Sequence, residues 1–228
     1  MKTLHDAREE VVRLAALATG DEKHFASSES TLDVLLVLYE RILRHDATRP
    51  DWEERDRFLL SKGHGPAAFF AVLAHRGFFP QDWLAGFMTR GSRLGAHPDR
   101  LLVPGVEVST GSLGHGLAMG VGVALALRAK GLLAARTFVL TGDAELNEGS
   151  NWEAFLAAPA LGLGNLTAIV VDNHSSTVPL TGLEPALRAL GWDAMRIDGR
   201  DHDALEAGLD RRHATTPTAV IADVRRVN

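Results

Sequence analysis

Carboxylate and amide side chains follow two apolar segments of the sequence. Asp143 comes shortly after Thr137–Leu140, and Asn173, thirty residues further on, follows Thr167–Val171. If both segments are neighbouring strands of a parallel sheet, their carboxyl ends share one edge, where such folds bind ligands. Carboxylate and amide oxygens there could hold Mg²⁺, with water and phosphate oxygens completing its octahedron. A simple capping turn after the first strand explains Gly142 and Asp143 about equally well.

Histidines in glycine-rich segments precede these residues. His64 lies within Ser61–Gly65, His115 lies within Gly111–Gly116, and His97 lies between them in the sequence. Glycine lets a backbone come close to a ligand, and histidine can exchange protons near neutral pH. One histidine in a loop is more often a surface residue. Several in glycine-rich loops favour a functional site without settling it.

Strand and helix patterns alternate along the chain. Strands separated by helices predict a doubly wound, mostly parallel α/β sheet with helices on both faces, formed by one domain over residues 1–228. The segment Leu113–Gly131 is nearly uncharged, so it is expected to be a helix buried on most sides. The predicted strands are Arg57–Leu60, Thr137–Leu140, Thr167–Val171, Asp193–Ile197 and Thr218–Asp223. The other predicted helices are Asp6–Leu17, Thr31–Arg44 with Ser30 as its cap, Pro66–His75, Gln81–Thr89, Glu148–Leu161, Leu183–Leu190 and Asp203–Arg212.

Composition narrows the class of protein. The 228 residues include 46% hydrophobic ones, carry a net charge of −5 and contain no cysteine. Disulfides, thiolate metal sites and a cysteine nucleophile are therefore excluded, and a nucleic-acid partner is not expected. The first ten residues lack the apolar core of a secretory signal, and Leu117–Leu127 is too short to span a bilayer. We expect a cytoplasmic protein without a membrane partner.

Several sequence blocks resemble the N-terminal half of transketolase, in the form that is divided into two separate subunits. The thiamine diphosphate signature of that family starts at Gly-Asp-Gly and ends at an Asn close to thirty residues later. The resemblance implies the thiamine diphosphate-binding fold, in its diphosphate-binding domain. The blocks that carry it are Leu60–His64, His97-Pro98, Pro104–Gly114, Gly142–Ala154, Asn165–Asn173, Leu183–Pro185 and Gly191-Trp192.

The resemblance also implies roles for particular residues. Mg²⁺, or Ca²⁺ or Mn²⁺ in its place, would bind the side chains of Asp143 and Asn173 and the backbone carbonyl of Ser175. The cofactor-binding residues would be His64, Gly111, Ser112, Leu113, Gly142, Asp143, Ala144, Glu145 and Asn173, with the N–H of Ala144 on the diphosphate. The catalytic residues would be His24, His64, His97 and His115, together with Glu148, which would link paired active sites.

The function implied is transfer of a two-carbon ketol unit from a ketose or ketose phosphate to an aldehyde. The domain that binds the cofactor's pyrimidine would be a separate C-terminal subunit, in a heterotetramer with two copies of each chain. One alternative keeps the cofactor but delivers the two-carbon unit to a carrier protein or a biosynthetic intermediate, as in enzymes that resemble pyruvate dehydrogenase. A second alternative is a non-catalytic scaffold with the same fold.

The sequence departs from the family pattern at several positions. Ala144 replaces the second glycine of Gly-Asp-Gly, which requires a negative φ at that position. His115 stands where the family has glutamine, and the usual His-Pro-Gly-Gly is His24–Ser27. The segment that follows Asn173 is short, so we expect a more open pocket, a more loosely bound cofactor, or a cover supplied by a partner.

Overall fold

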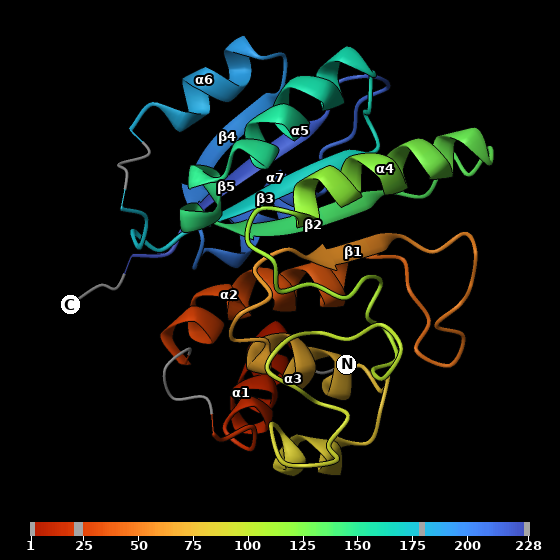
Figure 1. Ribbon diagram of the computed structural model, residues 1–228, viewed down its shortest axis with the longest axis vertical. Helices are drawn as coiled ribbons and strands as arrows, with labels where there is room; N and C mark the ends of the chain where they lie inside the picture. Colours follow the sequence, from red (N-terminus) through yellow and green to blue (C-terminus); the bar gives the residue numbers. More distant parts are fainter. Residues whose placement is uncertain (1–2, 21–24, 178–180, 226–228) are drawn as a thin grey trace.

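The described residues of the computed structural model, 3–20, 25–177 and 181–225, form a five-stranded parallel sheet (Figure 1). The strand order is β1-β2-β3-β5-β4. Every neighbouring pair is parallel, which confirms the predicted α/β class. The strands are β1 (Arg57–Leu60), β2 (Thr137–Gly142), β3 (Leu166–Asp172), β4 (Asp193–Asp198) and β5 (Thr218–Asp223).

Helices cover both faces of this sheet (Figure 1). Alternate side chains of a strand point to opposite faces, so Phe138 and Leu140 of β2 enter one core while Val139 enters the other. The first core lies under α1 (Leu4–Ala15), α2 (Phe25–Val37), α3 (Ala67–His75) and α7 (His202–Leu209). The second lies under α4 (Gly116–Ala129), α5 (Gly149–Ala160) and α6 (Leu183–Ala189).

Most helices begin or end one to three residues from the predicted bounds, and the largest difference is at the start of α2. The helix predicted to start at Thr31 is α2, which starts at Phe25 and continues as a π-helical turn over Leu38–Ile42. The prediction of Ser30 as a cap is therefore wrong, because Ser30 lies inside the helix and its hydroxyl donates to the carbonyl of Ser27 at 2.8 Å. The segment after Pro80 forms a 3-10 helix over Gln81–Gly86.

Helix α4 is buried on one side, so the expectation of burial on most sides is wrong for this chain by itself. Ala118, Gly122 and Ala126 are exposed on its opposite side. The buried side approaches the sheet closely, since a Cβ on Gly120 would lie 2.3 Å from Cγ2 of Val139. No helix in the described part of the chain is both long and apolar enough to cross a membrane.

Candidate functional site

Asp143 lies where β2 ends, next to the end of β3. Gly142 pairs with Val171 in the parallel ladder, so the residues that follow each strand share one edge. The Asp143 side chain is almost fully buried and starts the short 3-10 helix η4 (Asp143–Asn147). Its carboxylate accepts the N–H groups of Ser175 and Ser176 at 2.6 and 2.9 Å, and the Ser175 hydroxyl at 2.8 Å. The segment after β3 therefore folds over the end of β2.

Asn173 reaches the same point. Its Oδ1 accepts the Ser175 N–H at 3.2 Å, so the oxygens of Asp143 and Asn173 converge on a single donor. A carboxylate and an amide oxygen suit a hard divalent cation. Within the described residues no group of three or more His, Cys, Asp or Glu could hold a metal, so further oxygens would have to come from a backbone carbonyl, water or phosphate. The two side chains fit the expected ion, and the Ser175 carbonyl stays a predicted ligand.

Ala144 meets the expectation of a negative φ at its position, which its methyl group requires. Among the described residues, the non-glycine positions with positive φ are Met88 and His174, so Ala144 has ordinary backbone geometry. It lies in η4, directly after Asp143. Its contact with a diphosphate remains a prediction, but its side chain creates no backbone strain.

His64 and His97 come together at the ends of the loops that follow β1 and precede α4. Their ring centroids lie 4.6 Å apart in an edge-to-face arrangement, and both residues retain some exposure to solvent. Gly111 lies against them with φ of 148°, where an added Cβ would lie 2.8 Å from Cδ2 of His97. A Cβ on Gly63 would in turn lie 2.8 Å from the Gly111 nitrogen. These glycines are required for the loops to approach the histidines.

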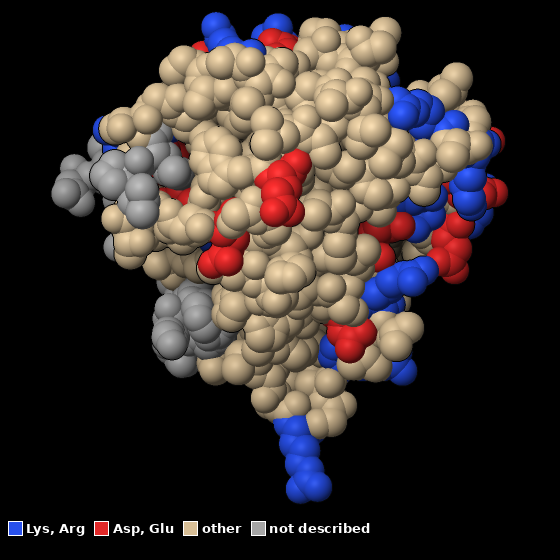
Figure 2. All heavy atoms as spheres, turned by 45° about the horizontal axis from the view of Figure 1, so that its top comes forward, with Lys and Arg blue, Asp and Glu red and all other residues tan. Residues whose placement is uncertain are grey.

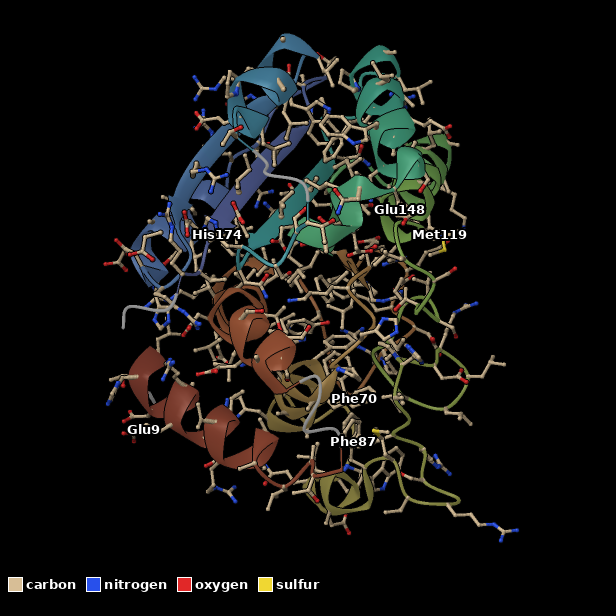
Figure 3. All side chains as sticks on the ribbon, turned by 60° about the vertical axis from the view of Figure 1, so that its left-hand side comes forward. Glu9, Phe70, Phe87, Met119, Glu148 and His174 are labelled. Atoms are coloured by element: carbon tan, nitrogen blue, oxygen red, sulfur yellow. The ribbon has the colours of Figure 1, made fainter. Side chains whose placement is uncertain are left out.

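The other predicted residues near α4 lie at the surface. Leu113 is 44% exposed, Ser112 is exposed, and His115 precedes α4 with its Nδ1 3.0 Å from the Leu113 carbonyl oxygen. Glu148 precedes α5, beside the start of α4, as Figure 3 shows. It packs on Gly114, where an added Cβ would lie 2.5 Å from the Cβ of Glu148. His24 lies outside the described residues.

Two charged groups lie next to Asp143: Glu145, which is buried, and Lys62, which is partly buried. Burial raises the pKa of Glu145, while hydrogen bonds from Ser61, Gly142 and Gly114 act against the rise. Burial also lowers the pKa of Lys62 to about 8, although Asp143 and Glu145 act against the fall.

Lys62 was missed as a site residue by the sequence analysis. Its Nζ donates to the Ser30 hydroxyl at 2.8 Å and to the Ser27 carbonyl at 3.2 Å. A buried lysine is rare without partners. The sequence offered one indication of its role, because Lys62 lies between a predicted strand and the Gly63-His64 pair. The contacts of Lys62 with α2 became evident only in the structure.

Comparison with known proteins agrees with this fold. Residues 10–227 match the family model described as "Transketolase, thiamine diphosphate binding domain". A protein of Actinobacillus succinogenes, named as one subunit of an apulose-4-phosphate transketolase, is 37% identical, over 78% of this chain and 67% of its own length. The solved transketolase from Leishmania mexicana superposes with a TM-score of 0.84 at 28% identity, over 97% of this chain. This chain spans 37% of the Leishmania protein.

A further relative carries a different kind of name. The protein "Ferredoxin fas2" of Rhodococcoides fascians is 49% identical over 208 residues, which are 91% of this chain and 68% of its own length. This chain contains no cysteine and so has no thiolate for an iron–sulfur cluster. The assignment rests on the matching family model, the superposed fold and the Actinobacillus relative, which agree. The chain belongs to the transketolase family and corresponds to the thiamine diphosphate-binding domain of that family.

Proposed function

We propose that this chain is the thiamine diphosphate-binding component of a two-component transketolase-like enzyme. It would transfer a two-carbon ketol unit from a ketose or ketose phosphate to an aldehyde. The observation that carries the proposal is the convergence of Asp143 and Asn173 at one edge of the sheet that also bears the loops of His64 and His97. The Actinobacillus relative, whose name assigns it to a transketolase for a sugar phosphate, supports it.

The residues would divide the work as follows. Asp143 and Asn173 would hold Mg²⁺, Ca²⁺ or Mn²⁺ and through it the diphosphate, to which the Ala144 N–H would donate. When bound, the cofactor supplies the carbanion chemistry that breaks and forms a carbon–carbon bond beside a carbonyl. His64 and His97 would take and return protons at substrate oxygens, which suits imidazoles held side by side in an open part of the site.

A separate pyrimidine-binding subunit would cover the apolar face beside the site. The outer side of α4 carries small apolar residues, and Leu113 and Leu156 are 44% and 57% exposed. Figure 2 shows few charged side chains over the centre of the face that it presents. Exposed apolar surface of this kind is typical of protein interfaces. It supports contact with a second chain. We propose a heterotetramer with two copies of each chain in the cytoplasm, in which residues 1–228 form one domain.

Calorimetry with thiamine diphosphate and Mg²⁺, with and without the pyrimidine-binding subunit, tests the proposal. Binding that needs the metal is expected, and Asp143→Ala should abolish it because the variant loses the buried carboxylate. Unchanged affinity in Asp143→Ala would refute the metal assignment. Absence of binding in both arms would remove the enzyme function and favour a scaffold.

A steady-state assay of both subunits then addresses the acceptor. Ketol transfer between sugar phosphates is the expected result. Transfer to a carrier-protein thiol without transfer to any aldehyde would instead favour the carrier or biosynthetic function.

A further inference from the structure

One buried carboxylate joins the separate loops of the site. The side chain of Glu145 is 2% exposed and points into the protein. Its Oε1 accepts the Gly114 N–H at 3.1 Å, and its Oε2 accepts the Gly142 N–H at 2.9 Å. Gly114 belongs to the loop before α4, whereas Gly142 ends β2. The two glycines are far apart in sequence and are held by the two oxygens of one residue.

Ser61 extends this network to β1. Its hydroxyl donates to Oε1 of Glu145 at 2.7 Å and accepts the Gly116 N–H at 3.1 Å. The turn into α4 is thus fixed at Gly114 by Glu145 and at Gly116 by Ser61. A Cβ on Gly116 would lie 2.3 Å from the Cβ of Ser61, so the turn lies directly on the end of β1.

The network lies between two groups of predicted cofactor contacts. Oε2 of Glu145 closes the turn that starts η4, which carries Asp143 and Ala144. Oε1 holds the loop in which Gly111 and Leu113 precede Gly114. Glu145 therefore determines how far the segment expected to hold the diphosphate lies from the segment expected to border the cofactor's rings.

We propose that Glu145, together with Ser61, is a positioning residue of the cofactor site, acting through backbone N–H groups. The inference rests on the proposed function. Three donors from the chain occupy its carboxylate, and two of them are the backbone N–H groups of Gly114 and Gly142, so Glu145 holds these two glycines in place. A glutamine at this position could keep one acceptor oxygen, but its amide N–H would face a backbone or hydroxyl donor. The charge-neutral variant therefore breaks one side of the network while conserving volume.

The test compares Glu145→Gln and Ser61→Ala with a matched change at the surface, Glu54→Gln, whose side chain is exposed. The first measurement is amide hydrogen exchange of the full chain without ligand. The second is the affinity for thiamine diphosphate with Mg²⁺, measured with the pyrimidine-binding subunit present. Faster exchange confined to the peptides with Gly114 and Gly142 is expected in Glu145→Gln, with affinity reduced about tenfold or more. Ser61→Ala should speed exchange at Gly116, and Glu54→Gln should match the wild type.

Each result separates the possibilities. Wild-type affinity in Glu145→Gln would overturn the inference and leave the proposed function intact. An alternative result for Glu145→Gln is faster exchange throughout the chain, a lower melting temperature and a loss of affinity no larger than the loss of folded protein explains. That result would show a purely structural role and would also overturn the inference. Failure of the wild type to bind thiamine diphosphate would be a failure of the proposed function, and the inference would fall with it.

Discussion

Replacement of Asp33 by asparagine should destabilise the fold through a cluster of charges that joins three helices. Asp33 lies on α2 with its side chain 2% exposed. Its carboxylate accepts Nε of Arg8 from α1 at 2.7 Å, Nη1 of Arg200 at 2.6 Å and Nε2 of His202 from α7 at 2.9 Å. One buried anion therefore holds α1 and α7 against α2.

The size of the loss follows from the exposure of the partners. Removing one member of a buried ion pair costs about 3–5 kcal/mol when the remaining charge stays buried. Here Arg8, Arg200 and His202 are 41%, 32% and 24% exposed, so water can hydrate them partly once the carboxylate is gone. We therefore expect Asp33→Asn to lower the free energy of unfolding by about 3 kcal/mol. For a chain of this size that corresponds to a melting temperature lower by roughly 6–12 °C.

The same cluster predicts a dependence on pH. Burial alone would raise the pKa of Asp33, but hydrogen bonds from Arg8, His202 and Arg200 outweigh it, and the pKa lies below its ordinary value. A carboxyl whose pKa is lower in the folded state contributes stability above its unfolded pKa of about 3.9 and loses it as the pH falls towards the folded pKa. The difference between wild type and Asp33→Asn should therefore shrink below about pH 4.

Urea denaturation of both proteins from acidic to mildly alkaline pH measures these quantities. Asp203→Asn is the matched control, because that side chain is 94% exposed and lies 3.5 Å from Arg41 at the surface. It should change the free energy of unfolding by less than about 1 kcal/mol. An Asp33→Asn variant as stable as this control near neutral pH would refute the argument that the buried carboxylate holds the three helices together.

Two further changes probe the site. Gly114→Ala should reduce affinity for thiamine diphosphate and lower stability by about 1–3 kcal/mol, because φ is 79° and the new Cβ would lie 2.5 Å from Glu148. Gly122→Ala, whose new Cβ would have no atom of another segment within 4 Å, is the control for the stability of this chain by itself, and equal melting temperatures would contradict the prediction. Burial lowers the pKa of Lys62 from 10.5 to about 8, so between these pH values the unfolded chain still binds the proton that the folded chain has lost. The free energy of unfolding of the wild type should therefore rise by roughly 2–3 kcal/mol relative to that of Lys62→Met as the pH rises across this interval. A difference independent of pH in denaturant titrations would show that the lysine is solvated.

The strands could be predicted from the sequence because of where they lie. β1 and β5 are found at the predicted residues, and every residue of β2 and β3 is buried. Continuous apolar runs are the sequence signature of strands covered on both faces. The boundaries of α2 could not be found in the same way, because Ser27, Ser28 and Ser30 resemble a capping segment. In the structure their polar groups bond to Lys62 and Ala68, which only the tertiary fold brings near.

The residues of the site also include some that the sequence predicts and some whose contacts it does not predict. Asp143 and Asn173 were accessible from the sequence, since each follows an apolar strand and parallel strands end at a common edge. The contacts of Glu145 were not accessible, because its partners Ser61 and Gly114 lie 84 and 31 residues away in the chain. Their pairing depends on the register of β1 against β2 and on the close approach of α4.

The glycines of the site explain why its loops depend on hydrogen bonds to backbone N–H groups. At Gly63, Gly111, Gly114 and Gly116 an added Cβ would come within 3.0 Å of another segment or of a histidine of the site. Such contacts leave no space for a side chain at these glycines, so the glycine backbone packs directly on the neighbouring segment and its position depends on hydrogen bonds to N–H groups. A buried acceptor with two oxygens can hold two such segments at once, as Glu145 does for Gly114 and Gly142. The shape of the site is therefore determined as much by one inward-facing carboxylate as by the residues expected to contact the ligand.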